Sequence, residues 1–144
     1  MKIVILGAGR IGSSLARNLS NSNYEVCIVD EDKSKLSVLE DKLDIMTVEG
    51  SASHLTTLKK SGLDEHTIVL AVTSNDEVNI VACQIAKKAF NVKKTICRFG
   101  DNSYFGKLDI FGEGVIDIPF SPEDEITTHL KELVDHPGAN QIES

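Results

Sequence analysis

The sequence predicts an α/β protein built around one doubly wound, parallel β-sheet, and three observations lead to this fold class. Short runs rich in Ile and Val alternate with longer segments of helical periodicity along most of the 144 residues. These runs are apolar at successive positions, as is typical of strands that helices cover on both faces. The first run enters a glycine-rich turn, which is how the first strand and helix of such folds are joined.

Six runs are expected to form the strands of the sheet. In chain order they are Lys2–Leu6, Glu25–Asp30, Asp44–Val48, Thr67–Thr73, Thr95–Phe99 and Val115–Ile118. Repeated strand–helix–strand units with right-handed crossovers predict a Rossmann-like sheet with the strand order 3-2-1-4-5-6.

The first two helices are expected from their spacing and caps. The helix after the glycine-rich turn places Ile11, Leu15 and Leu19 on one face. The second begins after Asp32, a favourable N-cap residue, and its leucines recur at helical spacing.

The next helices are expected between the third strand and the sixth. Ser53 is expected to cap a short helix that stops at Gly62. Asp76 is expected to cap a longer helix that ends near Phe90, and a weaker helix is expected over residues 102–111. The residues expected on the inner faces of the short and the long helix are Leu55, Leu58, Val78, Val81, Ile85 and Ala89.

Residues 1–120 are expected to form the Rossmann-like lobe, and residues 121–135 a C-terminal crossover or dimerisation helix after it. Ser121 is a suitable N-cap, Pro122 suits the first helical position, and acidic residues follow. Because the sheet is complete before this helix, its apolar face is expected to pack on a partner chain or a second lobe; alternatively it folds back onto its own sheet. Residues 136–144 are expected to begin a further lobe that this chain does not contain. The apolar face consists of Ile126, Leu130, Leu133 and Val134.

Composition and charge exclude several classes of protein. A net charge of −7 argues against a nucleic-acid or anionic-membrane surface. No apolar run approaches the ~18 residues of a membrane span, and the chain opens on a core strand rather than a signal peptide. The three cysteines lack a CxxC spacing and the four histidines lack metal-ligand spacing, which favours reduced, buried thiols in a cytosolic protein without a metal site.

The turn after the first strand has the pattern of a site for the phosphates of a nucleotide. Gly7 allows a tight turn, Gly9 lets phosphate oxygens approach the backbone, and Gly12 allows the helix to pack closely on the sheet. The N–H groups that begin a helix favour negative charge. The guanidinium of Arg10 is expected to form a bidentate contact with the phosphate oxygens. The alternative is an ordinary solvated side chain.

An acidic residue closes the second strand, where the ribose of a bound dinucleotide is expected. Asp30 lies 18 residues after Gly12, and its carboxylate would accept hydrogen bonds from the ribose hydroxyls. Together with Glu31 and Asp32 it would repel a 2′-phosphate, which favours NAD(H) or an unphosphorylated adenosine over NADP(H). The alternative is a fold that kept the turn without binding a ligand.

The chain lacks the parts of a catalytic site. All of its predicted strand–helix units belong to the nucleotide-binding fold. No residues remain for a second lobe that would bind a substrate and supply a general acid or base. It contains neither a GxSxG motif nor a Walker lysine, and the pair Asp76-Glu77 is interpreted as acids at a helix N-terminus. A sensor or regulatory domain is therefore favoured over an enzyme, the alternative being the nucleotide-binding domain of a larger NAD-dependent oxidoreductase.

Several motifs taken together resemble the RCK (KTN) domain of TrkA-type potassium-uptake regulators. The resemblance covers nearly the whole chain, and it is most specific where the glycine motif with Arg10 occurs together with the Val-Thr-x-x-Asp-Glu-x-Asn string. The motifs are Gly7-Ala8-Gly9-Arg10-Ile11-Gly12, Glu49-Gly50-Ser51-Ala52, Ala71-Val72-Thr73-Ser74-Asn75-Asp76-Glu77-Val78-Asn79, Ile96-Cys97-Arg98-Phe99 and His136-Pro137-Gly138-Ala139-Asn140-Gln141.

The resemblance implies a role for each candidate site residue. Asp30, with Glu31 beside it, would hold the adenosine ribose, and Arg98 would reach a ligand phosphate or a partner subunit. The family usually has an acid where Ser51 stands, and a serine accepts a hydrogen bond from the adenine amino group more weakly. The residues implied at the phosphates, the adenine and the far half of the pocket are, respectively, Gly7, Ala8, Gly9, Arg10, Ile11 and Gly12; Ser51 and Ala52; and Thr73, Ser74 and Asn75.

The resemblance also implies a cellular role. Such domains are cytoplasmic, non-catalytic subunits that dimerise and often form rings beneath an integral-membrane potassium transporter. NAD(H), or ATP and ADP in close relatives, changes the assembly and gates the transporter. The expected partners are therefore a second copy of the chain and a membrane subunit at the inner face of the cell membrane, with neither nucleic acid nor direct membrane insertion.

Overall fold

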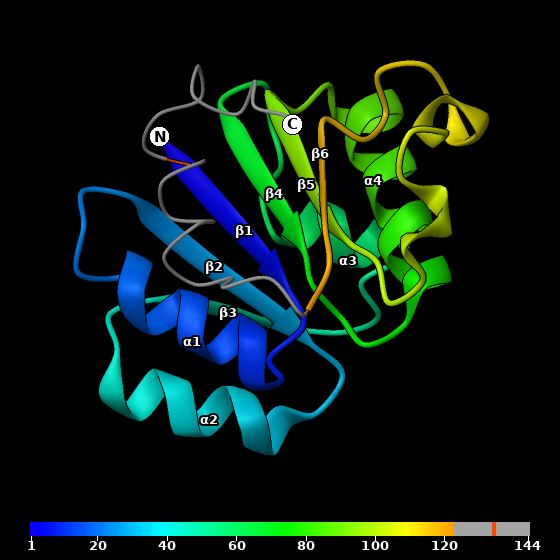
Figure 1. The fold of residues 1–144 in the computed structure, drawn as a ribbon. Coiled ribbons are helices and arrows are strands. Elements are labelled where there is room, and N and C mark those ends of the chain that lie inside the picture. Colours follow the sequence, from blue (N-terminus) through cyan, green and yellow to red (C-terminus); the bar gives the residue numbers. More distant parts are fainter. Residues whose placement is uncertain (123–133, 135–144) are drawn as a thin grey trace.

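A computed structural model describes residues 1–122 and Val134, and its six strands form one parallel sheet (Figure 1). The strand order β3-β2-β1-β4-β5-β6 confirms the predicted doubly wound topology. The strands are β1 (Lys2–Leu6), β2 (Glu25–Asp30), β3 (Met46–Glu49), β4 (Thr67–Ala71), β5 (Lys94–Arg98) and β6 (Ile118–Phe120).

The central strands are buried on both faces because helices cover the sheet from two sides. The helices are α1 (Arg10–Leu19), α2 (Lys33–Lys42), α3 (Leu55–Lys60) and α4 (Asp76–Phe90). Alternate residues of β1 enter opposite cores: Ile3 and Ile5 pack with the leucines of α1 and α2, whereas Val4 and Leu6 pack with α3 and α4. Every residue of β4 is buried, which explains the continuous apolar run seen in the sequence.

The first two helices form as predicted. Leu15 and Leu19 of α1 are fully buried, and Ile11 packs at the margin of the same core. The Asp32 side chain accepts a hydrogen bond of 2.9 Å from the backbone N–H of Ser34, so Asp32 caps α2.

The predicted caps of α3 and α4 are wrong by one residue. The N-cap of α3 is His54 rather than Ser53, without a side-chain cap bond. The N-cap of α4 is Asn75, whose side chain accepts a 3.0 Å hydrogen bond from the N–H of Val78. Asp76 instead accepts hydrogen bonds from the N–H groups of Gly100 and Asp101. The local sequence of the helix contains no signal for these long-range partners.

The predicted inner faces of these helices are correct only in part. Leu58 of α3 is buried, as predicted, but Leu55 is 53% exposed. On α4, Val81 is 38% exposed and Ala89 is also exposed, while Val78 and Ile85 pack at the edge of the core. The centre of the buried stripe is Asn79, Ile80, Ala82, Cys83 and Ala86. The stripe is displaced because it includes a polar residue, Asn79, which a hydrophobic pattern leaves out.

The segment between β5 and β6 holds two short 3-10 helices in place of the predicted helix over 102–111. They are Asn102–Tyr104 and Leu108–Phe111. Gly106 separates them with a φ of +84°, a left-handed conformation that ends regular helix. Tyr104 and Phe111 anchor the segment, because their ring centroids lie 5.4 and 6.4 Å from that of the buried Phe99.

The bounds of β1 and β2 are as predicted, whereas β3 to β6 differ from the predicted strands by one to three residues at one or both ends. The predicted strand Val115–Ile118 is wrong at both ends, because the ladder with β5 begins only where Ile118 pairs with Ile96 and continues to Phe120. Val115 and Ile116 are buried without belonging to the ladder, so burial alone produced the strand-like pattern. β3 begins at Met46 rather than residue 44, β4 ends at Ala71 and β5 ends at Arg98.

The predicted C-terminal helix (residues 121–135) and the predicted further lobe (residues 136–144) lie outside the described residues. The exceptions are the helix positions Ser121, Pro122 and Val134. Val134 is 2% exposed and belongs to the core that α1 and α2 cover. Within residues 1–122 and at Val134, no helix is long and apolar enough to cross a bilayer.

Candidate functional site

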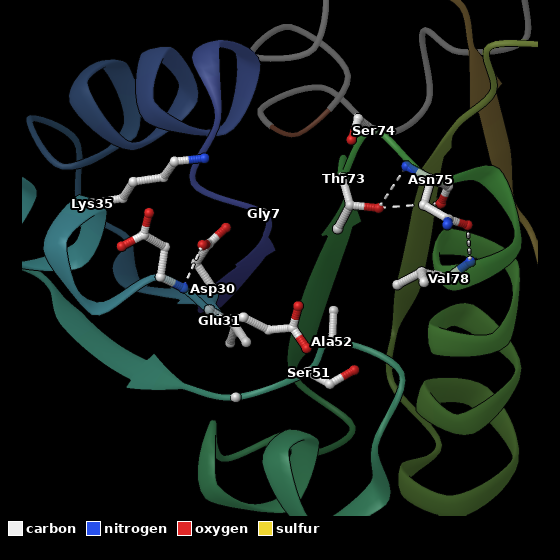
Figure 2. Close-up of a pocket in the computed structure, with 13 residues that line it drawn as sticks. Gly7, Asp30, Glu31, Lys35, Ser51, Ala52, Thr73, Ser74, Asn75 and Val78 are labelled. Carbon is white, nitrogen blue, oxygen red and sulfur yellow. Dashed lines mark hydrogen bonds between the residues drawn. The ribbon is translucent and has the colours of Figure 1, made fainter.

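A pocket of about 510 Å³ opens at the carboxyl ends of the strands, where the strand order reverses between β1 and β4 (Figure 2). Ligands of doubly wound folds bind at this switch point. The lining combines the glycine turn, the end of β2, the segment after β3 and the segment after β4. It consists of Gly7, Val29, Asp30, Glu31, Asp32, Lys35, Gly50, Ser51, Ala52, Thr73, Ser74, Asn75 and Val78.

The glycine turn has the close approaches that the sequence predicts. Gly7 has a φ of +111°, and a Cβ built on it would lie 3.0 Å from the Cα of Thr73. A Cβ on Gly12 would collide with the carbonyl oxygen of Gly7. At Gly9 no heavy atom lies within 4 Å of the Cβ position, and no side chain caps α1. The start of α1 is therefore open to a ligand that needs backbone donors.

The Asp30 carboxylate joins the turn to the start of the next loop. Its Oδ1 accepts a 2.9 Å hydrogen bond from the N–H of Ala8, and its Oδ2 accepts one of 2.8 Å from the N–H of Asp32. An ionised carboxylate has about four lone-pair sites, so each oxygen retains one for a further donor. Asp30 is thus held in place and still able to accept hydrogen bonds from a hydroxyl.

The acidic side of the pocket continues along the loop that leads into α2. Glu31 and Asp32 are exposed and line the pocket together with Lys35 of α2 (Figure 2). The pKa of the Asp32 carboxyl is lowered by hydrogen bonds from the side chain and then the backbone of Ser34. Sequence reasoning missed Lys35, although its place three residues after the N-cap Asp32 could have pointed to it.

The segment after β3 lines the pocket next to the end of β2. The N–H of Gly50 donates a 3.0 Å hydrogen bond to the carbonyl oxygen of Asp30. The hydroxyl of Ser51 lies 3.2 Å from that of Ser53, and Ala52 is buried. The structure therefore brings Ser51 and Ala52 to the same pocket as Asp30.

The segment after β4 forms the opposite wall, in which Thr73, Ser74 and Asn75 line the pocket (Figure 2). Thr73 Oγ1 accepts a 3.2 Å hydrogen bond from the N–H of Asn75, whose side chain caps α4. This wall lies on the side of the switch point away from Asp30.

A second hollow of about 490 Å³ lies between α1 and α2 and shares Lys35 with the first pocket. It is lined by Ala8, Gly9, Arg10, Ser13, Arg17, Lys35, Val38 and Leu39. Arg10 and the Ala8–Gly9 backbone thus face this hollow rather than the main pocket. Ile11 and Gly12 line neither space; Gly12 is buried and Ile11 is half-buried.

Arg98 lies behind the pocket wall. Its Nη1 donates hydrogen bonds of 3.3 Å to the carbonyl oxygen of Val72 and 3.2 Å to that of Thr73. It lines neither of the two spaces described above. A sequence gives no sign of these partners, because backbone carbonyl groups carry no residue signature.

The described residues contain three cysteines and no metal-binding cluster. All three cysteines are free and buried, and burial raises the pKa of the Cys27 thiol to about 11. No group of three His, Cys, Asp or Glu side chains in the part of the chain that the structure describes could hold a metal ion.

Known proteins resemble this chain in sequence over nearly its whole length. The TrkA-N domain family matches residues 3–122. The chain is 40% identical over 144 residues to the Trk system potassium uptake protein TrkA of Halomonas elongata, and 37% identical over 147 residues to the protein of the same name from Vibrio alginolyticus. These alignments include 99% and 100% of the chain but 32% of each relative, so the chain spans about a third of their length.

Solved structures share the fold at low sequence identity. The NAD(P)-binding domain of an exopolyphosphatase-related protein from Archaeoglobus fulgidus superposes with a TM-score of 0.72 and 20% identity, over 92% of this chain and 96% of that one. The GsuK channel bound to NAD superposes with a TM-score of 0.66 and 18% identity, over 82% of this chain and 21% of that one.

Proposed function

Because this chain belongs to the TrkA-N domain family, we propose that it is the nucleotide-binding regulatory domain of a potassium uptake system. The observation that carries the proposal is the pocket between the Gly7 turn and Asp30, at the reversal of strand order. The relatives named as Trk system potassium uptake proteins support the assignment to potassium uptake.

The proposed ligand is an adenosine nucleotide, with NAD(H) preferred and ATP or ADP as alternatives. Asp30 has acceptor sites left for the ribose hydroxyls after its two backbone hydrogen bonds. Ser51 and Ala52 would border the adenine. Phosphate groups that extend into the second hollow would meet the open backbone at Gly9, with Arg10 beside them. NAD(H) is preferred because the pocket extends beyond this adenosine half to the wall after β4.

The far half of a dinucleotide would contact the wall formed by Thr73, Ser74 and Asn75. Arg98 holds two carbonyl groups of this wall, so it would act on the ligand from behind the wall or through a partner subunit. The solved NAD complex of the GsuK channel, which shares the fold, is consistent with this use of the pocket.

The domain would regulate rather than catalyse. Residues 1–120 would bind the nucleotide, residues 121–135 would connect or dimerise, and residues 136–144 would begin a C-terminal lobe. A homodimer, or a ring of dimers, would lie in the cytoplasm against an integral-membrane potassium transporter. A ligand that binds one arrangement of the assembly more tightly would shift the population toward it and so gate transport.

Calorimetric titration tests ligand binding directly. The 144-residue chain is titrated with NADH, NAD⁺, ATP and ADP. We expect binding of NADH or NAD⁺, with the tightest ligand raising the melting temperature at saturation. Absence of heat and of thermal stabilisation with all four, up to millimolar ligand, would contradict the proposal.

Replacing Asp30 tests the ribose contact. We expect Asp30→Ala to weaken all four ligands by about tenfold, because each carries the adenosine ribose and loses a charge-assisted hydrogen bond. Asp64→Ala is the matched control, since Asp64 also accepts a backbone hydrogen bond but does not line the pocket. Equal affinities for the Asp30 and Asp64 variants would remove Asp30 from the site.

A further inference from the structure

The wall after β4 has no regular secondary structure, yet one buried side chain fixes it. Asn79 of α4 is fully buried. Its Oδ1 accepts hydrogen bonds from the backbone N–H and the hydroxyl of Thr73, at 3.0 and 2.6 Å. Its Nδ2 donates to the carbonyl oxygens of Thr73 and Arg98, at 3.0 and 3.1 Å. Every donor and the acceptor of the amide is therefore used.

These hydrogen bonds are costly to lose because the Asn79 side chain that makes them is fully buried. A buried backbone group that loses its partner carries the full cost of desolvation. Without the Asn79 amide, the N–H of Thr73 would need another partner, because Thr73 lies two residues beyond the end of the β4 ladders. The side chain thus selects one conformation of Thr73 and, through the Thr73 hydroxyl, of the following Asn75.

The same side chain links the wall to two other parts of the pocket region. A Cβ built on Gly7 would lie 3.0 Å from the Cα of Thr73, so the conformation of Thr73 also shapes the surface that the glycine turn faces. The carbonyl of Arg98 joins the wall to the end of β5, and the Arg98 guanidinium returns to the carbonyl of Thr73. The wall after β4 and the end of β5 are therefore held together, and the turn after β1 lies against this wall.

We propose that Asn79 is a positioning residue that holds the far half of the nucleotide pocket in its binding conformation, and so determines whether a dinucleotide gains affinity over a mononucleotide. The proposal rests on the proposed nucleotide function. It assigns no ligand contact to Asn79, because the amide faces Thr73 and Arg98 rather than the pocket. Its effect is selective because Asp30, Ser51 and Ala52, which would hold the adenosine half, make no hydrogen bond with it in the part of the chain that the structure describes.

The test compares two ligands rather than one. NAD⁺ spans both halves of the pocket, whereas AMP ends in the adenosine half. Titrations of the unaltered 144-residue chain and of Asn79→Leu are expected to show NAD⁺ weakened by about tenfold and AMP by less than about twofold, the size of effect expected for losing roughly one buried hydrogen bond. Asn79→Asp keeps the acceptor for Thr73 but turns an oxygen toward the carbonyl groups of Thr73 and Arg98, so it is expected to weaken NAD⁺ at least as much as Asn79→Leu.

A matched control removes a comparable buried network at the other end of β5. Thr95 is fully buried; its hydroxyl donates to the carbonyl of Val115 at 2.6 Å and accepts from the N–H of Asp117 at 3.1 Å. Thr95→Val is expected to lower the melting temperature and leave the ratio of NAD⁺ to AMP affinity unchanged. A purely structural role for Asn79 would make its variants behave in the same way as Thr95→Val.

The outcomes separate the two proposals. If the unaltered chain binds both ligands and the Asn79 variants weaken them equally, or not at all, the positioning role is overturned while the nucleotide function remains. If the unaltered chain binds neither ligand, and NADH, ATP and ADP also fail to bind, the nucleotide function itself is overturned, and the positioning role with it. If the Asn79 variants do not fold, hydrogen exchange on the unaltered chain decides: the Thr73 amide is expected to be strongly protected without ligand, and exchange at the rate of an unbonded amide would overturn the role.

Discussion

At each end of β5 a buried polar side chain makes hydrogen bonds to backbone groups, but the two sets of bonds stabilise different segments of the chain. At the carboxyl end, Asn79 holds the loop residue Thr73 and the Arg98 carbonyl. At the amino end, Thr95 bonds to Val115 and to Asp117, which lead into β6. The amino-end network thus joins β5 to the approach of the last strand, and the carboxyl-end network fixes a loop that borders the pocket.

The difference shows that hydrogen-bond chemistry alone does not identify a functional residue. Both side chains are fully buried and both bond to backbone groups. Only the partners of Asn79 lead to the open edge of the sheet, where the ligands of doubly wound folds bind. We therefore expect changes near the amino ends of the strands to alter stability alone, and changes near the carboxyl ends to alter ligand affinity as well.

The largest effect is expected at the carboxyl edge. Gly12→Ala places a methyl group against the carbonyl oxygen of Gly7, in a backbone contact that can relax only if α1 moves off the sheet. We expect a loss of about 3 kcal/mol in the free energy of unfolding, together with loss of nucleotide binding. Urea unfolding and titration measure the two. Gly9→Ala is the control, because its Cβ position is open and its stability should change by less than about 0.5 kcal/mol.

The pH dependence of the free energy of unfolding tests the core between the two edges of the sheet, through the buried thiol of Cys27. Burial raises the pKa of Cys27 in β2 to about 11, above its ordinary value of 9.0. The thiol therefore contributes stability that is complete below pH 9.0 and is lost as the pH rises through about 11, to a limit of about 3 kcal/mol. Urea unfolding between these pH values should show a steeper decline for the unaltered chain than for Cys27→Ala. Equal slopes would contradict the assignment to this thiol.

The smallest effect is expected at the amino edge. The Nζ of Lys87 lies 2.8 Å from Asp117 Oδ2, and the two side chains are 20% and 32% exposed. Because solvent and salt screen this pair, Lys87→Met should lower the free energy of unfolding by about 0.5 kcal/mol at low ionic strength, and by less in high salt. Lys88→Met on the exposed face of α4 is the control. A change in nucleotide affinity from Lys87→Met would break the proposed separation of the two edges.

Elements with local signals were predictable from the sequence, and those that depend on distant partners were not. The bounds of β1 and β2 and the cap Asp32 follow from runs and caps that lie next to each other in the chain. The cap of α4 was misplaced because Asn75 and Asp76 are both good caps. The choice between them depends on Gly100 and Asp101, to which Asp76 bonds across the fold.

The candidate site divides in the same way. The meeting of Gly7, Asp30, Ser51 and Thr73 could be predicted, because the carboxyl ends of parallel strands share one edge of the sheet. The placement of Arg10 in a separate hollow and of Arg98 behind the wall could not be predicted. A long side chain can reach several backbone and solvent positions from one Cα, and its partners here are carbonyl groups or open space.

For protein engineering, the two backbone hydrogen bonds of Asp30 mean that ligand preference and loop geometry cannot be redesigned one at a time. A change aimed at accepting a 2′-phosphorylated nucleotide would begin by neutralising this carboxylate. It would also release the N–H groups of Ala8 and Asp32, and with them the alignment of the turn with the next loop. A successful design would have to supply new acceptors for both amides before it added a cation for the phosphate.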